Sequence, residues 1–136
     1  KEVGAARTGF GKPYLVYGQM TRPLELTVPK IDLDWYFYNG SSGLGSLHEQ
    51  GTFQVPQVSH AAWWDGKGNL GLFFANLSQE EITLEVPASQ ILHRFSGRGI
   101  FAIELKTRQI SRHIKLEDTV RIPLNARQIA LLEVQQ

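Results

Sequence analysis

The chain has 136 residues, of which 42% are hydrophobic and 20% are charged, with 13 Gly and 6 Pro. This composition is that of one globular domain, and it excludes disordered, collagen-like and coiled-coil chains. The net charge of +1 is too small to steer the whole molecule to a polyanion or an anionic membrane, and the lack of cysteine excludes disulfides, thiol nucleophiles and thiolate zinc sites.

The first 13 residues are polar and Gly-rich, and we interpret them as a tail or as the end of a preceding domain. Because the chain begins at Lys1 without a methionine, we expect a fragment or a processed product. No apolar run reaches the roughly 18 residues that would suggest a membrane span, so no membrane partner is expected. The sequence does not indicate the cellular compartment. We expect residues 14–136 to form a single domain.

From Ile31 onward, apolar positions recur with period two between turn residues, which predicts antiparallel strands. In "KIDLDWYFYNG", one strand face carries four apolar residues and the other four polar or tyrosine residues. The apolar positions are Ile31, Leu33, Trp35 and Phe37, and the alternate positions are Asp32, Asp34, Tyr36 and Tyr38. The segment 41–51, rich in small residues, is predicted to be a long surface loop.

Two further strands, "QVSHAAWW" and "LGLFFANL", flank a hairpin turn at residues 65–69, and the second is apolar on both faces, which predicts a central strand. "EITLEVPA", "GIFAIEL", "QISRHIKL", "DTVRIPL" and "RQIALLEV" follow as strands, with Ile110 and Ile114 as core contacts. No helix is predicted. About eight strands with short connections favour an all-β, antiparallel Greek-key β-sandwich, with a small barrel as the alternative.

The hairpin contains a formal Gly-x-Gly-x-x-Gly at Gly66, Gly68 and Gly71. In a dinucleotide site this motif opens a helix, whose N-terminal N–H groups hold the pyrophosphate. Here an apolar strand follows the motif instead. We therefore interpret the glycines as turn residues and predict no nucleotide cofactor.

Exposed aromatic rings stack on the C–H faces of sugars while carboxylates bond their hydroxyls, so the aromatic and acidic residues are candidate carbohydrate ligands. The candidates are Tyr36, Tyr38, Trp63, Trp64, Asp32 and Asp34. In the alternative, which we favour, Trp35, Phe37 and one of the paired tryptophans are core residues, and the tyrosines pack against a neighbouring domain or lean over the sheet. The pattern does not decide which tryptophan of the pair faces outward.

No catalytic constellation emerges. Asp32, Asp34, Glu49 and Asp65 are close only in sequence, and the four histidines lack metal-ligand spacing, so we predict no catalytic residue, no metal and no cofactor. A third hypothesis, a cupin-like enzyme, would use His48, Glu49 and His60. The basic residues from Arg94 to Lys115 lack interleaved aromatics, so no nucleic-acid partner is expected.

Three stretches together resemble the C-terminal all-β domain that follows the catalytic (β/α)-barrel in many glycoside hydrolases. "YLVYGQMTRPLEL" resembles the segment by which such chains leave the barrel. "AAWWDGKGNLGLFFANLSQEEITLEV" resembles their strand, Gly-rich hairpin and apolar strand ending in Asn, and "VRIPLNARQIALLEV" resembles their closing hairpin. The resemblance covers most of residues 14–134.

This resemblance implies a non-catalytic domain that packs on and stabilises the catalytic barrel of the same chain, with polysaccharide as a second partner in some members. No catalytic residue carries over, because the family's catalytic acids lie on the barrel. An apolar patch should then be exposed, either around Tyr14, Leu15 and Tyr17 or on the face of Tyr36 and Tyr38. An independent carbohydrate-binding module is the alternative function.

Overall fold

A computed structural model describes residues 1–39, 46–95 and 102–135, with the side chains of residues 38, 39 and 46–48 excepted. The elements of these residues, in chain order, are α1 (Glu2–Thr8), α2 (Lys12–Leu15), β1 (Gln19–Thr21), β2 (Lys30–Asn39), β3 (Ser46–Pro56), β4 (Val58–Trp64), β5 (Leu70–Asn76), β6 (Ile82–Pro87), α3 (Ala88–Leu92), β7 (Ala102–Thr107), β8 (Ser111–His113), β9 (Thr119–Leu124) and β10 (Ile129–Gln135).

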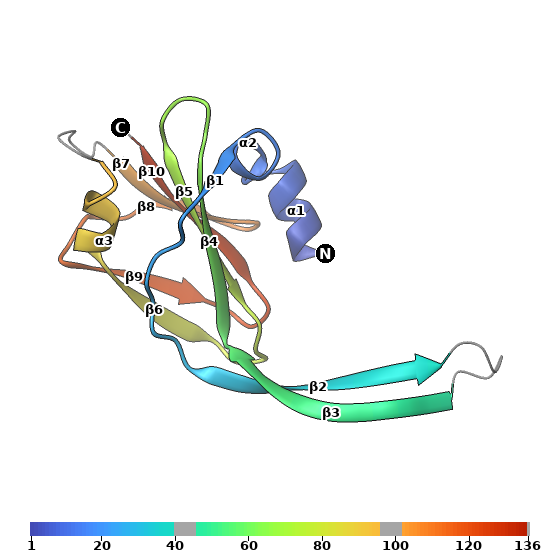
Figure 1. Ribbon diagram of the computed structural model, residues 1–136. Coiled ribbons are helices and arrows are strands. Elements are labelled where there is room, and N and C mark those ends of the chain that lie inside the picture. The colour runs from blue at the N-terminus through green and yellow to red at the C-terminus, as the bar shows by residue number, and fades with distance from the viewer. Residues whose placement is uncertain (40–45, 96–101, 136) are drawn as a thin grey trace.

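The fold is mostly antiparallel β-structure, as the alternating sequence predicts. Six strands form the main sheet in the order β1-β4-β5-β10-β7-β8, with every neighbouring pair antiparallel. A two-stranded sheet of β6 and β9 lies against one face of the main sheet, and α1 and α2 lie against the other (Figure 1). The Greek-key connection stays a prediction.

The main core fills the space between the main sheet and the β6–β9 layer. Alternate residues of the central strands point into it, among them Leu72 and Phe74 of β5 and Leu132 of β10, each at most 1% exposed. Leu84 of β6 and Ile122 of β9 meet them from the second layer. Because β5 lies between β4 and β10 and is covered on both faces, its continuous apolar sequence is explained.

A smaller core lies on the outer face of the main sheet, beneath the two N-terminal helices. It consists of Tyr14 from α2, Phe73 from β5 and Leu131 from β10, and the rings of Tyr14 and Phe73 meet edge to face with centroids 6.0 Å apart. The Tyr14 ring lies over Gly71, where an added Cβ would come within 2.7 Å of the ring. Gly71 therefore makes room for the helix side chain.

The glycine-containing turn joins β4 to β5. The Asp65 carboxylate accepts hydrogen bonds from the backbone N–H groups of Lys67 and Asn69, each at 2.8 Å, and Gly68 has a φ of 89°. Positive φ is readily adopted by glycine because it has no Cβ. The motif is thus a hairpin turn, as predicted, and no helix follows it.

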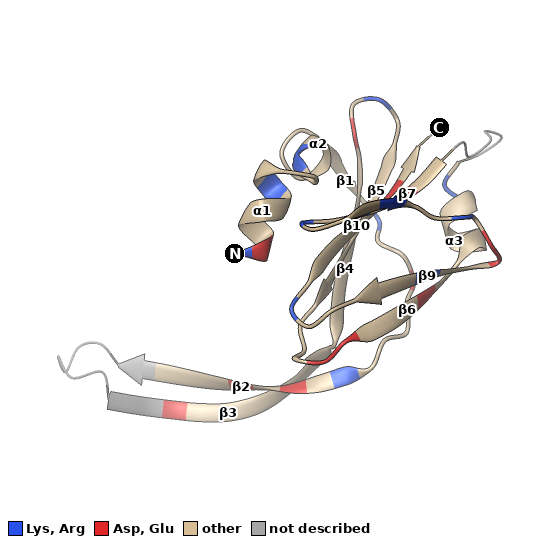
Figure 2. Ribbon diagram, turned by 180° about the vertical axis from the view of Figure 1, so that it is seen from behind, with Lys and Arg blue, Asp and Glu red and all other residues tan. Residues whose placement is uncertain are grey.

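Strands β2 and β3 pair only with each other and project away from the sandwich in both views (Figures 1 and 2). We call residues 30–56 the arm. It leaves and rejoins the sandwich at adjacent points, because the backbone N–H of Gln57 donates to the carbonyl of Pro29 at 2.7 Å. Beyond that point the chain continues directly into β4.

Three expectations are corrected. The chain does contain helices: α3 buries Ala88 and Ile91, a spacing of three that the surrounding strand pattern obscured. Residues 46–51 belong to strand β3 rather than to a loop, because they pair with β2, while residues 41–45 lie outside the described residues. Ile110 is 47% exposed beside β8, whereas Ile114 packs against the main core.

Candidate functional site

The structure distributes the candidate carbohydrate ligands over three places. Asp32, Asp34 and Tyr36 lie on the arm, and Tyr38 occupies a β2 position there whose side chain is outside the described residues. Trp63 and Trp64 lie on β4, on opposite faces of the main sheet. These residues therefore do not converge on one surface.

One face of the arm is polar. Antiparallel pairing places Asp32 opposite Gln54, Asp34 opposite Thr52, and Tyr36 opposite Gln50. The Thr52 hydroxyl donates to Asp34 Oδ1 at 2.9 Å, and a shallow depression of about 350 Å³ lies beside Asp34 and Tyr36. We call this surface the polar arm face.

The opposite face of the arm is apolar and exposed. Its apolar residues are Ile31, Leu33, Trp35, Phe37, Phe53 and Val55, which we call the apolar arm face, and Glu49 lies opposite Phe37 at the outer end of the same face. Trp35 is 39% exposed, Phe37 is 52% exposed and Phe53 is 48% exposed. The expectation that Trp35 and Phe37 are core residues is therefore wrong, because in the part of the chain that the structure describes no second layer covers β2.

Trp35 packs across the arm onto the backbone of its partner strand. It pairs with Gly51, where an added Cβ would lie 2.7 Å from the indole Nε1. The glycine thus lets the indole lie flat on the strand, an arrangement known to support glycines in strands. An apolar surface results at the middle of the arm.

Trp63 belongs to the outer face of the main sheet. Its ring meets Phe73 edge to face with centroids 5.4 Å apart. Together with Val3, Leu15 and Ile129 it lines an apolar groove of about 180 Å³ between the N-terminal helices and the sheet. The expected patch around Tyr14 is thus only partly present, because Tyr14 itself is 1% exposed.

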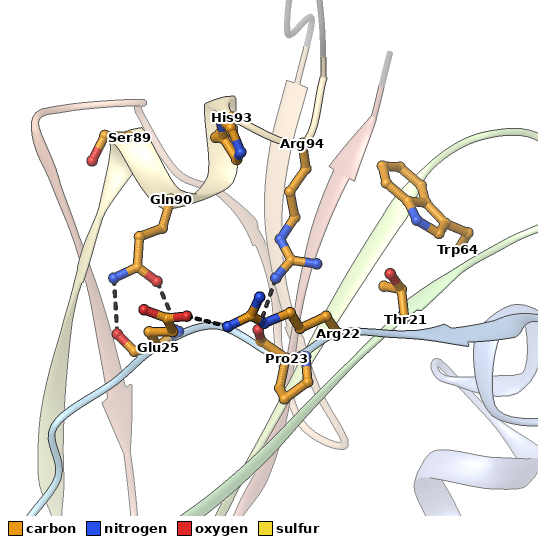
Figure 3. A pocket seen from close by; sticks show the side chains of 9 residues that line it. All are labelled: Thr21, Arg22, Pro23, Glu25, Trp64, Ser89, Gln90, His93 and Arg94. Carbon is orange, nitrogen blue, oxygen red and sulfur yellow. Dashed lines mark hydrogen bonds and ion pairs between the residues drawn. The ribbon is translucent and has the colours of Figure 1, made fainter.

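Trp64 lines a larger pocket at the other side of the sheet, shown in Figure 3. This pocket, which we call the arginine pocket, has a volume of about 680 Å³. Its lining residues are Thr21, Arg22, Pro23, Glu25, Trp64, Ser89, Gln90, His93 and Arg94. They come from the end of β1 and the segment after it, from the end of β4, and from α3 and the turn that follows it.

Hydrogen bonds fix the wall between the extended segment and α3. The Gln90 side chain bonds Glu25 at both ends, accepting from its backbone N–H at 3.0 Å and donating to its carbonyl at 2.8 Å. Arg94 Nη2 donates to the carbonyl of Pro23 at 2.8 Å. The side chain of Arg94 thus runs from the end of α3 down toward Arg22 (Figure 3).

The arginine pocket carries a surplus of positive charge. Burial lowers the pKa of Arg94, and the neighbouring charge of Arg22 lowers it further. Arg22 pairs with Glu25, whereas no carboxylate of the described residues pairs with Arg94. An anion would relieve the repulsion between the two guanidinium groups.

A polar network crosses the outer face of the main sheet. Glu133 accepts from the Tyr14 hydroxyl at 3.0 Å and from Lys106 Nζ at 2.7 Å, and Lys106 also contacts Glu104 at 3.1 Å. Desolvation opposes the charge of Lys106, but the hydrogen bonds and charges of Glu133 and Glu104 outweigh it and raise the pKa of Lys106. Glu104 also accepts from Ser111, which lowers the pKa of Glu104. These groups satisfy one another and stabilise the sheet.

The residues of the cupin-like hypothesis do not form a described site. Glu49 lies on the arm, His60 lies on β4 with Nε2 2.8 Å from the carbonyl oxygen of Leu24, and the His48 side chain is outside the described residues. Among the residues that the structure describes, no group of three or more metal-ligating side chains is found. In the same residues, no helix has the length and apolar character needed to cross a bilayer.

Sequence reasoning did not single out Arg22 or Gln90, and it considered Arg94 only as the first residue of a basic stretch. Arg22 lies after β1, whereas Gln90 and Arg94 lie in α3 and the turn after it, and only folding brings these two stretches beside Trp64. The sequence did identify Trp64 as a candidate sugar ligand. No local sequence pattern, however, indicates that Arg22 or Arg94 lies beside it.

No protein-family model matches the chain, and no curated protein matches it. Among solved structures, the thermostable GH51 α-L-arabinofuranosidase from Thermotoga petrophila is similar with a TM-score of 0.45 and 14% identity, covering 62% of this chain and 21% of that chain. The GH51 arabinofuranosidase from Xanthomonas axonopodis pv. citri is similar with a TM-score of 0.42 and 20% identity, covering 64% and 22%. The chain thus spans about a fifth of the length of these enzymes.

Proposed function

We propose that this chain is a non-catalytic β-sandwich domain of a larger, glycoside-hydrolase-like protein, and that it packs on and stabilises the catalytic barrel of that protein. The observation that carries the proposal is the apolar arm face. An isolated two-stranded hairpin is marginal in water, and this one presents Leu33, Trp35 and Phe53 on a projecting surface. Such a surface is typical of an element that a partner covers.

Three features favour a barrel of the same chain as that partner. The resemblance of residues 14–134 to barrel-associated domains names this neighbour. The apolar groove beside Val3 and Trp63 offers a second contact area on the helix side of the sheet. The arm has few charged residues among those described, namely Lys30, Asp32, Asp34 and Glu49 (Figure 2), and the register places Asp32 and Asp34 on the polar arm face and Glu49 opposite Phe37. The part of the apolar arm face around Leu33, Trp35 and Phe53 can therefore be desolvated without burying a charge of β2, and Glu49 lies beyond it toward the outer end of the arm.

The test begins with the coding sequence around the chain, followed by expression of the encoded barrel with and without this domain. We expect the domain to raise the melting temperature of the barrel, because binding to the folded state stabilises it by mass action. The double variant Leu33→Ser, Phe53→Ser should abolish that increase. The matched control, Asp32→Ser, Gln54→Ser on the polar arm face of the same strands, should retain it.

Three results would contradict the proposal. One is a coding sequence without a barrel, and another is a barrel whose stability is the same with the domain, without it and with the apolar-face variant. Hydrolysis of a glycoside by this chain alone would contradict its non-catalytic role.

The polar arm face supports a second candidate function, polysaccharide binding by an independent module. Tyr36 is 55% exposed beside Asp34, and the pairing with Gln50 and Thr52 adds amide and hydroxyl groups. Saturable binding to a polysaccharide that is lost in a Tyr36→Ala, Tyr38→Ala double variant would support this function. Unchanged binding in that variant would show that the polar arm face is not the polysaccharide-binding surface.

A further inference from the structure

We propose that the arginine pocket binds an acidic sugar, with the ring of a uronate stacked on Trp64 and its carboxylate held by Arg22 and Arg94. The choice of a sugar rests on the proposed role in a carbohydrate-active protein, whereas the charge of the ligand follows from the pocket alone. The pocket volume of about 680 Å³ is within the usual range for small-molecule sites, roughly 300–1,000 Å³.

The charges of the pocket select an anion. Arg22 and Arg94 point toward the same space from opposite walls (Figure 3), and Glu25 is the one carboxylate among the lining residues. That carboxylate is bound to Arg22 and leaves Arg94 without an acidic partner among the described residues. Guanidinium groups present several N–H donors in a plane that fits a carboxylate, so an acidic ligand would bridge the pair.

Trp64 gives the pocket its preference for a ring. The indole is partly exposed at the pocket and is braced from behind by Phe95, with ring centroids 5.4 Å apart at 77°. A braced aromatic ring loses little conformational freedom when a ligand stacks on it. The aliphatic face of a pyranose matches this surface, and a simple inorganic anion does not use it.

The remaining lining groups suit hydroxyls. Thr21 contributes a side-chain hydroxyl beside Trp64 and His93 contributes an imidazole, whereas Ser89 lies beyond Gln90 at the other end of the pocket (Figure 3). Gln90 is different, because both ends of its amide are bonded to Glu25, so it positions the wall. A uronate therefore finds all three of its chemical features, ring face, carboxylate and hydroxyls, in one pocket.

The experiment measures binding of short oligogalacturonates and oligoglucuronates to this chain by calorimetry, with the methyl esters of the same oligomers as uncharged controls. We expect saturable binding to the acids and at least tenfold weaker binding to the esters, in the range for loss of a charge-assisted hydrogen bond, about 1.5–3 kcal/mol. Arg22→Gln, Arg94→Gln and Trp64→Leu should each weaken binding about tenfold.

One further substitution should strengthen binding rather than weaken it. Because Glu25 competes for Arg22, Glu25→Gln should tighten binding of the acidic oligomers by roughly two- to fivefold. Trp63→Leu on the other face of the sheet and Arg121→Gln on β9 are matched controls and should leave the affinity unchanged. Circular dichroism of each variant verifies its fold.

Absence of saturable binding to the acids would overturn the proposal, and so would equal affinity for acids and esters. Affinity that follows the Trp63 or Arg121 control rather than the pocket variants would place the site elsewhere and overturn it as well. Because these measurements use this chain alone, they are independent of docking to a barrel: an acidic-sugar site without barrel stabilisation would leave this inference standing and reject the proposed function.

Discussion

The hydroxyl of Tyr14 donates a hydrogen bond to Glu133 Oε2 at 3.0 Å and joins the second helix to the last strand of the sandwich. The two residues are 119 positions apart, and both are buried. The N-terminal helices are thus held to the sheet by a specific polar contact as well as by the small apolar core around Phe73.

Tyr14→Phe should destabilise the chain at neutral pH by about 1–2 kcal/mol, because Glu133 loses a donor in a buried site. Equilibrium unfolding in urea measures this change. Tyr17→Phe is the control, since Tyr17 is 71% exposed, and it should have no effect. Equal stability of the Tyr14 and Tyr17 variants would show that the hydroxyl contributes nothing to folding.

Stability should also fall at alkaline pH. Burial raises the pKa of Tyr14 above its ordinary value of 10.0, and the Glu133 charge and hydrogen bond raise it further. The pKa of Lys106 is raised above 10.5. A group whose pKa is higher in the folded than in the unfolded state stabilises below its unfolded pKa and loses that effect as the pH rises. Unfolding free energies measured from neutral pH to above pH 10 should therefore decline, and less steeply in Tyr14→Phe.

Two glycines of the Gly-x-Gly-x-x-Gly motif should differ in how far alanine destabilises the chain. At Gly71 an added Cβ would meet the Tyr14 ring at 2.7 Å, so Gly71→Ala should destabilise by about 1–3 kcal/mol, the usual cost of overpacking. At Gly66 nothing lies within 4 Å of the added atom, so Gly66→Ala should be close to neutral. Thermal unfolding compares the stabilities of the two variants. A smaller loss of stability in Gly71→Ala than in Gly66→Ala would contradict the packing of Tyr14 on Gly71.

Replacement of Asn76 by aspartate should destabilise the fold. Asn76 is 3% exposed, and its amide nitrogen donates to the carbonyls of Glu80 and Asn125 at 2.7 and 3.0 Å. Asn76→Asp would place a carboxylate against these carbonyls, with an expected loss of about 2–4 kcal/mol. The control is Asn125→Asp, because Asn125 is exposed. Chemical denaturation of both variants measures their free energies of unfolding. Near-equal values would show that the hydrogen bonds donated by the Asn76 amide do not stabilise the fold.

The arm should open locally far more often than the sandwich. Each arm strand has one paired edge, whereas β5 and β10 are paired on both sides. In hydrogen exchange of this chain, amides of β2 and β3 should exchange on the order of a hundredfold faster than those of β5 and β10. Similar protection of both regions would show that the arm is stabilised in a way that its pairing does not explain.

The sequence predicted those features that depend on neighbouring residues. The alternation in "EITLEVPA" placed Leu84 and Val86 in the core, and the turn residues placed the hairpin at Asp65. The same rule misplaced Trp35, since alternation shows that a strand has an apolar face but not whether a second layer covers it. Whether a second layer covers the strand depends on the tertiary structure.

The candidate site was predictable only in part, for a related reason. Trp64 stood out as an aromatic residue next to a turn, but its exposure depended on which face of β4 it occupies. Arg22 and Arg94 reach the same pocket through an extended segment and a helix that no periodic pattern predicted. Convergence of this kind is a property of topology, and a single sequence carries no local trace of it.

The hydrogen bond from Gln57 to Pro29 closes the base of the arm, so the two strands of the arm join the sandwich through one narrow neck. Evolution could therefore lengthen, shorten or replace everything beyond that neck without repacking the core, in the way that antibody loops vary on a constant framework. The same neck makes the domain a natural acceptor for foreign hairpins, since a graft there inherits a fixed base and a fixed direction.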